Sequence, residues 1–390
     1  MNAASPLDGA RRERIVALAR DLIRCKSLAG EERDVAGVVA RAMTALGYDE
    51  VKADALGNVV GRLRPAAPSS EGALLFDSHM DTVAAAGHWT KDPFGGEVSD
   101  GRIWGRGASD MKGALAASLC AAAFAKQDGR LRRDVLVCAS VNEEQIEGLA
   151  LAEVLDAYRP AYVVICESTA LQLNVGGRGR AEVFITTEGV PAHASDPSRG
   201  VNALKHMARL IAALQDWQPP HDADLGPGIL EPTEIISDPF PSVSVLPARC
   251  RVRADRRLLV GEGVGDVLAP IQEAIARLQR EDPTFKAHAE VDAGSITTYT
   301  GVTRSALKFM PAWKFDVEHP FARMARAALP EAPIGYYRFC TNAARSAGML
   351  GIPTIGFGPG LETDAHIADE SLSLDQLFGA AEGYYRLASL

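Results

Sequence analysis

Short apolar runs that alternate with helical segments constrain the fold of this chain more than any other feature. Three of these runs cover residues 74–76, 134–141 and 161–166, and their length and composition are typical of buried strands. Helices are expected around them; in residues 11–24, for example, apolar side chains recur at helical spacing. Buried strands that alternate with helices predict an α/β fold in which a mostly parallel sheet is flanked by helices on both faces.

Each of these three runs is followed by acidic residues or a histidine. His79 and Asp81 follow the first run, Glu143 and Glu144 follow the second, and Glu167 follows the third. The carboxyl ends of parallel strands meet at one edge of a sheet, where α/β proteins form their ligand crevices. Carboxylates gathered there would repel one another unless a cation were present. We therefore expect one or two divalent metal ions at this edge, since imidazole and carboxylate groups are ligands of zinc and similar ions.

Two residues outside these runs extend the set. The loop GRGASD places Asp110 just before an alanine-rich helix, and its glycines permit the tight backbone that would bring Asp110 toward the same edge. Ser109 is expected to cap that helix. His366 follows a predicted strand, 354–357, and a glycine-rich loop, and it supplies a second imidazole. Taken alone, Asp110 could be a helix cap, and Glu143 and Glu144 could lie in a solvated turn. Together with the other residues, they favour a metal site.

The pattern of elements changes after residue 176. It reads strand, helix, strand, strand, helix, strand, which is the ferredoxin-like βαββαβ order; the segments are 181–187, 202–217, 229–236, 242–258, 264–279 and 285–291. We interpret residues 179–293 as an inserted domain, and residues 1–178 and 294–390 as one discontinuous catalytic, metal-binding domain. His193 lies in the first loop of the insert, and its spacing alone assigns it no role.

Composition excludes several classes of partner. The 390 residues suit two domains, and the net charge of −9 argues against nucleic acid or an anionic membrane as a partner. The N-terminus lacks the apolar core of a signal peptide and no run is long enough to cross a bilayer, so a cytoplasmic location is expected. The six cysteines include no C-x-x-C pair and are expected to be reduced. A nucleophilic Cys340 is an alternative for which the sequence offers no paired base.

Eight segments together resemble a known family, the dinuclear-zinc amidohydrolases and exopeptidases. That family includes acetylornithine deacetylase, succinyl-diaminopimelate desuccinylase, aminoacylases and glutamate-releasing carboxypeptidases. The segments are SHMDTV, WTKDPFGG, GRGASDMKG, the NEE turn, CEST, AHAS with PSRGVNAL, LPARCRVRADRR, and FGPG followed by AHIADE. The resemblance spans nearly the whole chain and implies a zinc-exopeptidase-like catalytic domain with an inserted lid and dimerisation domain.

The resemblance also implies a ligand set. By position, Asp110 resembles the carboxylate that bridges two metal ions. Glu144 and His366 would complete the coordination of one ion, and His79 and Glu167 that of the other. Zn²⁺ is the expected ion, with Co²⁺ and Mn²⁺ as alternatives, because the same ligand types serve all three.

Three further residues acquire roles by resemblance. Glu143 resembles the general base, and Asp81 the acid that orients His79 through its other ring nitrogen. A water shared by two cations about 3.5 to 4 Å apart loses a proton readily, and an adjacent carboxylate can take that proton and return it to the leaving nitrogen. His193 would reach from the lid domain of one subunit to stabilise the oxyanion in the other, which implies a homodimer.

Substrate contacts are predicted at four positions. Arg257 resembles the arginine that binds a substrate carboxylate; a surface arginine on a strand is the alternative. Arg338 and Asn342 lie in YYRFCTNAARSAG, which occupies the place of the substrate-contacting loop. Ser244 stands where many members of the family have asparagine. The stretch YYRFCTNAARSAG resembles that of a less characterised branch of peptidases and deacylases more than that of acetylornithine deacetylase.

The function implied is hydrolysis of a C–N amide bond in a small N-acyl amino acid or dipeptide-like substrate. Hydrolysis of an N-carbamoyl or ureido group is an alternative reaction. An alternative of another class is a non-catalytic binding or regulatory protein on the same fold. The complete ligand set, together with Glu143, favours an enzyme.

Overall fold

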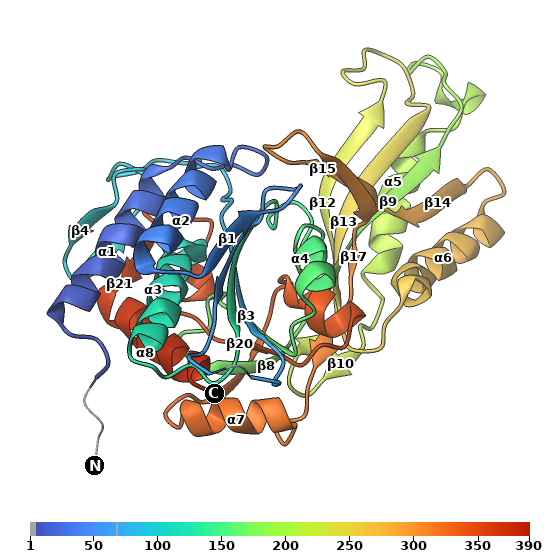
Figure 1. Cartoon of the computed structure of the whole chain (residues 1–390). Helices are drawn as coiled ribbons and strands as arrows, with labels where there is room; N and C mark the ends of the chain where they lie inside the picture. Colours follow the sequence, from blue (N-terminus) through green and yellow to red (C-terminus); the bar gives the residue numbers. More distant parts are fainter. Residues whose placement is uncertain (1–4, 68) are drawn as a thin grey trace. The chain divides into compact units, whose positions relative to one another are not determined.

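The computed structural model describes residues 5–67 and 69–390 and divides into two compact units, drawn in Figure 1. Apart from the residues not described, the first unit comprises 1–177, 295–305 and 313–390, and the second comprises 178–294 and 306–312. The second unit thus extends beyond the predicted range 179–293. It includes residues 306–312 because β17 (Phe309–Met310) pairs with β9 (Gly179–Glu188).

A nine-stranded sheet forms the centre of the first unit. Its order is β1-β2-β6-β3-β7-β20-β8-β18, with β19 also paired to β8. The neighbours β6, β3, β7 and β20 are parallel, whereas β1, β2 and β18 pair antiparallel. The sheet is therefore mixed, with its parallel part in the middle. The bounds are β1 Glu50–Ala53, β2 Val59–Leu63, β3 Leu74–His79, β6 Val135–Ser140, β7 Tyr162–Ile165, β8 Leu173–Gly177, β18 Trp313–Lys314, β19 Ile334–Tyr337 and β20 Thr354–Gly356.

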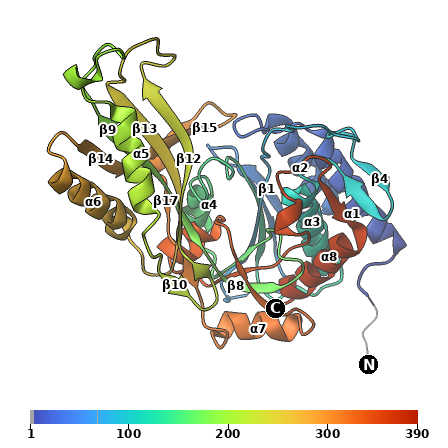
Figure 2. The same cartoon turned by 180° about the vertical axis from the view of Figure 1, so that it is seen from behind.

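Helices cover both faces of this sheet, as Figures 1 and 2 show. On one face, α3 (Gly113–Gln127) packs on β2, β3 and β6 and also contacts α1 (Gly9–Arg24), α2 (Arg33–Leu46) and α8 (Leu374–Ala388). Residues 113–125 of α3 are all buried, which explains its alanine-rich sequence. On the other face, α4 (Leu151–Tyr158) packs its leucines against apolar residues of β3, β6 and β7. This layering keeps the middle strands out of water, as parallel strands require.

Smaller elements complete the first unit. A three-stranded sheet in the order β21-β5-β4 joins the C-terminal segment to the loop before Asp110. Helix α7 contacts α8 and β8. The bounds are β4 Glu97–Ser99, β5 Arg102–Trp104, β21 Ser371–Ser373 and α7 Pro320–Ala328, while β15 (Ala293–Thr297) and β16 (Thr303–Leu307) lie at the junctions between the units along the chain.

The second unit is a ferredoxin-like sandwich, as predicted. Its main strands are antiparallel in the order β12-β13-β9-β14, and α5 and α6 contact them on one face around a common apolar core. The strand β13 begins at Arg249, later than the predicted residue 242, because Pro241 and Pro247 have no N–H to donate to a partner strand. The bounds are α5 Ala203–Leu214, β12 Ile229–Asp238, β13 Arg249–Leu258, α6 Val264–Glu281 and β14 Lys286–Val291, with a short hairpin of β10 (His221–Asp222) and β11 (Gly226–Pro227).

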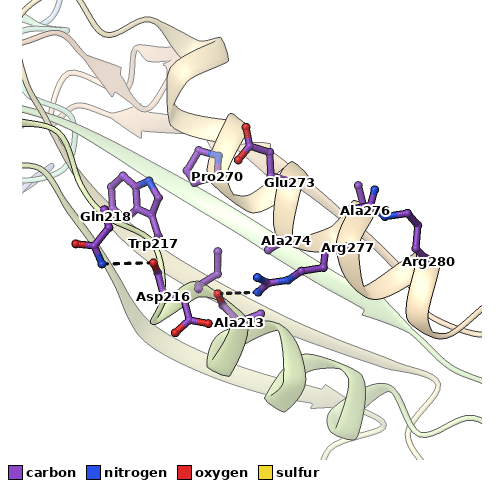
Figure 3. Close-up of a pocket in the computed structure, with 11 residues that line it drawn as sticks. Ala213, Asp216, Trp217, Gln218, Pro270, Glu273, Ala274, Ala276, Arg277 and Arg280 are labelled. Carbon is purple, nitrogen blue, oxygen red and sulfur yellow. Dashed lines mark hydrogen bonds between the residues drawn. The ribbon is translucent and has the colours of Figure 1, made fainter.

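A surface groove of the second unit lies beside α5 and α6 (Figure 3). Two of the polar side chains there donate to nearby backbone carbonyls: Arg277 to Ala213 over 3.3 Å and Gln218 to Asp216 over 3.5 Å. We therefore assign no chemistry to this groove.

None of the helices within residues 5–67 and 69–390 combines the length and apolar character that crossing a bilayer requires.

Candidate active site

The predicted ligands come together at the carboxyl ends of β3, β6 and β7. His79 is the last residue of β3, and it pairs in register with Ser140, the last residue of β6. Glu143 and Glu144 follow β6 directly, and Glu167 follows β7. Because the three strands are parallel neighbours, their following loops leave the sheet at the same edge.

Asp110 lies between two imidazoles. Its Oδ1 is 3.0 Å from Nε2 of His79, and its Oδ2 is 3.0 Å from Nε2 of His366. Each imidazole also faces its own glutamate: Glu167 Oε1 lies 3.3 Å from His79 Nε2, and Glu144 Oε2 lies 3.2 Å from His366 Nε2. One carboxylate shared by two histidine–glutamate pairs is the arrangement that two neighbouring cation sites need.

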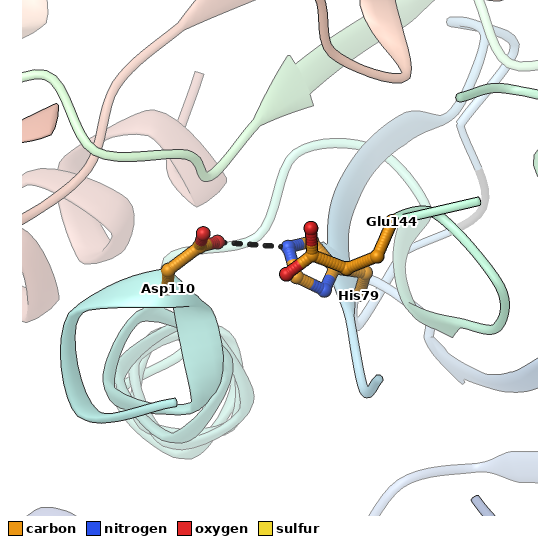
Figure 4. Close-up of side chains that lie close together, drawn as sticks. All are labelled: His79, Asp110 and Glu144. Carbon is orange, nitrogen blue, oxygen red and sulfur yellow. Dashed lines mark hydrogen bonds and ion pairs between the residues drawn. The ribbon is translucent and has the colours of Figure 1, made fainter. Parts of the chain in front are cut away.

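The donor atoms are close enough to share ions. One ligand atom each from His79, Asp110 and Glu144 lie within 4.8 Å of one another (Figure 4), and the same holds for His79, Glu143 and Glu167. Imidazole nitrogens and carboxylate oxygens are suitable ligands for zinc and related divalent ions. The residues present therefore fit a dinuclear metal centre. Glu143, the predicted base, belongs to the second of these groups.

Burial and the neighbouring charges shift the pKa values of the acids in this cluster. Burial raises the pKa of Glu143 well above its usual value; the charge of His79 opposes this shift, and the charges of Glu167 and Glu147 add to it. Burial and the charge of Asp110 raise the pKa of Glu144 to about 7. For Asp110 itself, burial acts upward, but hydrogen bonds from the two imidazoles outweigh it and lower the pKa. Without bound cations, the cluster thus holds protons that its acids would otherwise lose near neutral pH.

The pKa values of the two histidines shift upward, whereas burial alone would lower them. Burial lowers the pKa of His79, but the carboxylates of Glu167 and Asp110 outweigh it and raise the pKa well above its usual value. Hydrogen bonds to Asp110 and Glu144 raise the pKa of His366 to about 10. Both shifts favour the imidazolium form, with a proton on each ring nitrogen, when no cation competes for the ring.

Asp81 is placed differently from its predicted role. Its main-chain oxygen lies 2.9 Å from His79 Nδ1, whereas its carboxylate lies 3.7 Å away, beyond hydrogen-bonding distance. The acceptor that orients His79 is therefore the carbonyl of Asp81. The carboxylate instead accepts the N–H groups of Glu143 and Glu144, each over 3.1 Å. It thus fixes the turn that carries both glutamates.

The predicted capping role of Ser109 is wrong. Glu370 takes that role, because its Oε1 accepts the N–H groups of Ser109 (2.8 Å) and Asp110 (3.0 Å). Its Oε2 accepts a hydrogen bond from Nη1 of Arg106 over 2.5 Å. Both members of this ion pair are buried. Glu370 is the residue that the sequence analysis missed; its place in the AHIADE segment, four residues after His366, was the available signal.

The glycine requirement of this loop is confirmed at Gly107. Its φ is +84°, and a Cβ there would come within 2.9 Å of Thr82 Cγ2. A side chain at this position would therefore displace the loop that carries Asp110.

Asn342 does not present its amide to a substrate. It is buried, and its Nδ2 donates to Asp77 Oδ2 (2.8 Å) and Ser140 Oγ (3.2 Å), while its Oδ1 accepts the N–H of Gly148. Both amide hydrogens are thus used inside the fold, and the predicted substrate contact has no free donor there. Arg338, four residues before Asn342, is exposed. Cys340 is buried, and its thiol donates to the carbonyl oxygen of Thr341.

The predicted substrate residues Arg257 and Ser244 and the predicted catalytic residue His193 belong to the second unit. Arg257 lies on β13, half-buried, with its Nε 2.6 Å from Asp255 Oδ1. His193 is exposed, and its Nδ1 accepts the N–H of Ser195 over 3.1 Å. Ser244 is exposed at φ +51°, and its carbonyl oxygen accepts the N–H of Ala194. His193 and Ser244 therefore lie on neighbouring loop segments of this unit.

Comparison with known proteins identifies the family. The model of peptidase family M20/M25/M40 matches residues 75–390. This chain belongs to peptidase family M20/M25/M40. As a member of that family with a group of metal-binding residues, it is a metal-dependent hydrolase.

Three proteins are similar to this chain, two in sequence and one in fold. The uncharacterized protein YgeY of Escherichia coli is 32% identical over 379 residues, covering 94% of this chain and 91% of that protein. A succinyl-diaminopimelate desuccinylase of Cereibacter sphaeroides is 33% identical over 261 residues, covering 62% of this chain and 67% of that enzyme. The YXEP protein of Bacillus subtilis, a dinuclear metal binding peptidase of the M20 family, shares the fold with a TM-score of 0.71 at 14% identity, covering 98% of both chains.

The Glu370–Arg106 pair yields a prediction for stability. The variant Glu370→Gln retains an oxygen that can accept the two N–H groups but leaves the buried guanidinium without its counter-charge. We expect the free energy of unfolding to fall by about 3–5 kcal/mol, measured by urea denaturation. The double variant with Arg106→Met should recover part of that loss, whereas equal stability of Glu370→Gln and the unmodified protein would contradict the analysis.

The raised histidine pKa values yield a prediction for metal binding. Because the fold without cations favours protonated imidazoles and raises the pKa of Glu144, binding of divalent ions at about pH 7.5 should release about two or more protons per chain. Calorimetric titration of Zn²⁺ into chelator-treated protein, in buffers of different ionisation enthalpy, measures this release. His366→Ala should remove about one proton from it; a heat independent of the buffer would refute the prediction.

Proposed function

We propose that this M20-family protein hydrolyses the C–N amide bond of a small N-acyl amino acid or dipeptide-like substrate with two divalent metal ions. The observation that carries the proposal is Asp110, whose two oxygens face two imidazoles. The names of the relatives support it, since one is a desuccinylase and another a dinuclear metal binding peptidase. Zn²⁺ is the ion we propose, with Co²⁺ or Mn²⁺ as alternatives.

The ligand assignment follows the distances. Asp110 would bridge the two ions, with Glu144 and His366 on one side and His79 and Glu167 on the other. When bound, two such cations polarise the substrate carbonyl and lower the pKa of water. The carbonyl of Asp81 holds the tautomer of His79, and Glu370 holds the backbone at Asp110.

Glu143 is proposed as the general base. It is buried beside His79 and Glu167, and its raised pKa suits a group that must accept a proton near neutral pH. It takes a proton from the water whose oxygen attacks the amide carbon. It then gives that proton to the leaving nitrogen as the C–N bond breaks, so the products are a carboxylate and an amine.

His193 is proposed as the donor that stabilises the oxyanion. Because its Nδ1 accepts the N–H of Ser195, the neutral ring carries its proton on Nε2. The residue is exposed, and the hydrogen bond that its ring makes within this loop uses Nδ1, so we propose that this N–H serves another molecule. We propose that His193 of one subunit serves the active site of the other, in a homodimer.

Arg257 is proposed to bind a carboxylate of the substrate. Asp255 fixes its guanidinium through Nε, which orients the remaining N–H groups for a planar, bidentate partner. Exposed Arg338 and Ser244 are proposed as further contacts. Asn342 is left out because its amide is committed to Asp77 and Ser140.

A release assay tests this function. Zinc-loaded protein is incubated with N-acetyl, N-succinyl and N-carbamoyl amino acids and with dipeptides, with and without a chelator. We expect chelator-sensitive cleavage of N-acyl amino acids or dipeptides. Cleavage confined to the N-carbamoyl substrates would establish the ureido alternative instead. No cleavage by protein that holds two ions would favour a non-catalytic role.

The variant Glu143→Gln tests the general base. Loss of proton transfer should lower kcat by about 10²–10⁴-fold, with the metal content unchanged by mass spectrometry. Glu153→Gln, an exposed glutamate on α4, is the matched control and should turn over normally. Comparable rates for the two variants would remove Glu143 from its role.

Mixed dimers test the role of His193. His193→Ala and Glu143→Gln should each be nearly inactive alone. After dissociation and random reassembly, about a quarter of the unmodified activity should return, because half the dimers are hybrids with one complete site each. If His193 acted within its own subunit, every site would lack one group and mixing would restore nothing.

A further inference from the structure

Four consecutive backbone N–H groups around the proposed base are held by buried side chains. Val141 donates to Asn58 Oδ1 and Asn142 donates to Glu32 Oε1, each over 3.1 Å. Glu143 and Glu144 donate to the two oxygens of Asp81. None of these donors bonds within a helix or strand, so buried side chains take the place of backbone acceptors along this segment, 141–144.

Asn142 has the unusual backbone conformation of this segment. Its φ is +54°, in the left-handed region that few residues other than glycine occupy, although asparagine is one of those enriched there. The hydrogen bond from its N–H to Glu32 is the contact that fixes this peptide plane. The direction in which Glu143 leaves the backbone therefore depends on Glu32.

Glu32 is an unusual group to bury for a structural purpose alone. It is fully buried, and burial together with the charge of Asp81 raises its pKa to about 7. Its Oε1 accepts from Gly30 (3.0 Å) as well as Asn142, but its buried Oε2 has no partner among the described residues. Oε1 thus accepts all of the hydrogen bonds described for the carboxylate of Glu32.

Glu32 belongs to a segment that contacts three of the loops of the site. We define residues 25–32, between α1 and α2, as the brace segment. Lys112, just after Asp110, donates to the Cys25 carbonyl oxygen over 2.7 Å. Ser27 accepts the N–H of Thr82 and donates to the Met80 carbonyl oxygen, each over 2.8 Å. With Glu32, the brace segment contacts the loops that carry Asp110, Asp81 and Glu143.

We propose that Glu32 is a positioning residue for the reaction, acting through Asn142 on the general base Glu143. The brace segment lies before residue 75, where the match to the family model begins. This inference rests on the proposed role of Glu143. The contribution of Glu32 is geometric: one oxygen that accepts the N–H of Asn142, rather than a negative charge.

Two variants separate geometry from charge. Glu32→Gln can place an amide oxygen where Oε1 lies, and its NH₂ replaces an oxygen that has no partner, so kcat should stay within about threefold of the unmodified protein. Glu32→Ala removes the acceptor and should lower kcat by about 10²-fold, with KM and metal content little changed. The acyl substrate cleaved in the release assay is the probe.

A second measurement does not depend on turnover. Hydrogen–deuterium exchange of a peptide covering residues 141–148 should be about tenfold faster in Glu32→Ala than in Glu32→Gln. If the unmodified protein cleaves no substrate, the proposed function fails, while this exchange still decides whether Glu32 holds the segment.

The control and the contrary outcomes complete the test. Asp8→Ala removes a carboxylate that caps α1 by accepting the N–H of Arg11, and it should lower the midpoint of thermal unfolding without changing kcat. If Glu32→Ala behaves like Asp8→Ala, Glu32 is merely structural and the proposal is overturned. Equal loss of kcat in Glu32→Gln and Glu32→Ala would also overturn it, because charge would then be the contribution.

Discussion

The site depends on one carboxylate that two imidazoles share. Asp110 faces His79 from the first half of the chain and His366 from its end, so it joins two distant parts of the fold. Each imidazole is completed by a glutamate from a different loop. Such a concentration of acids is unfavourable unless protons or cations compensate the negative charge. The raised pKa values of Glu143 and Glu144 are a consequence of this arrangement.

The loops that hold these ligands are fixed by a recurring device, in which a buried carboxylate accepts backbone N–H groups. Glu370 does this at Asp110, Asp81 at Glu143 and Glu144, and Glu32 at Asn142. A buried carboxylate needs donors to offset its lost hydration, and a loop needs acceptors for its N–H groups. Each pairing satisfies both needs and leaves the side chains of the proposed ligands free to face one another.

The second unit carries residues for which we propose other roles, Arg257 in binding a substrate carboxylate and His193 in stabilising the oxyanion. Its ferredoxin-like sheet carries Arg257 on a central strand, whereas His193 and Ser244 lie in loops. Rigid strands suit recognition of a carboxylate, because the guanidinium is oriented before the substrate arrives. The exposed His193, with its tautomer set by Ser195, suits a group that acts on a separate molecule.

The sequence by itself determined the α/β class, the ferredoxin-like order of the insert and the identities of the clustered residues. These features are local: apolar runs mark buried strands, and the residues directly after them must leave the sheet at its carboxyl edge. The resemblance of eight segments added the family, which the comparisons confirm.

Only the tertiary structure decided which partner each polar group has. Glu370 replaces Ser109 as the acceptor at Asp110, and the carbonyl of Asp81 replaces its carboxylate against His79. Asn342 turns inward to Asp77 rather than toward a substrate. The residues in the first and last of these contacts are hundreds of positions apart. The physical reason is that a hydrogen bond depends on positions within a fraction of an ångström, and packing of the whole chain sets those positions.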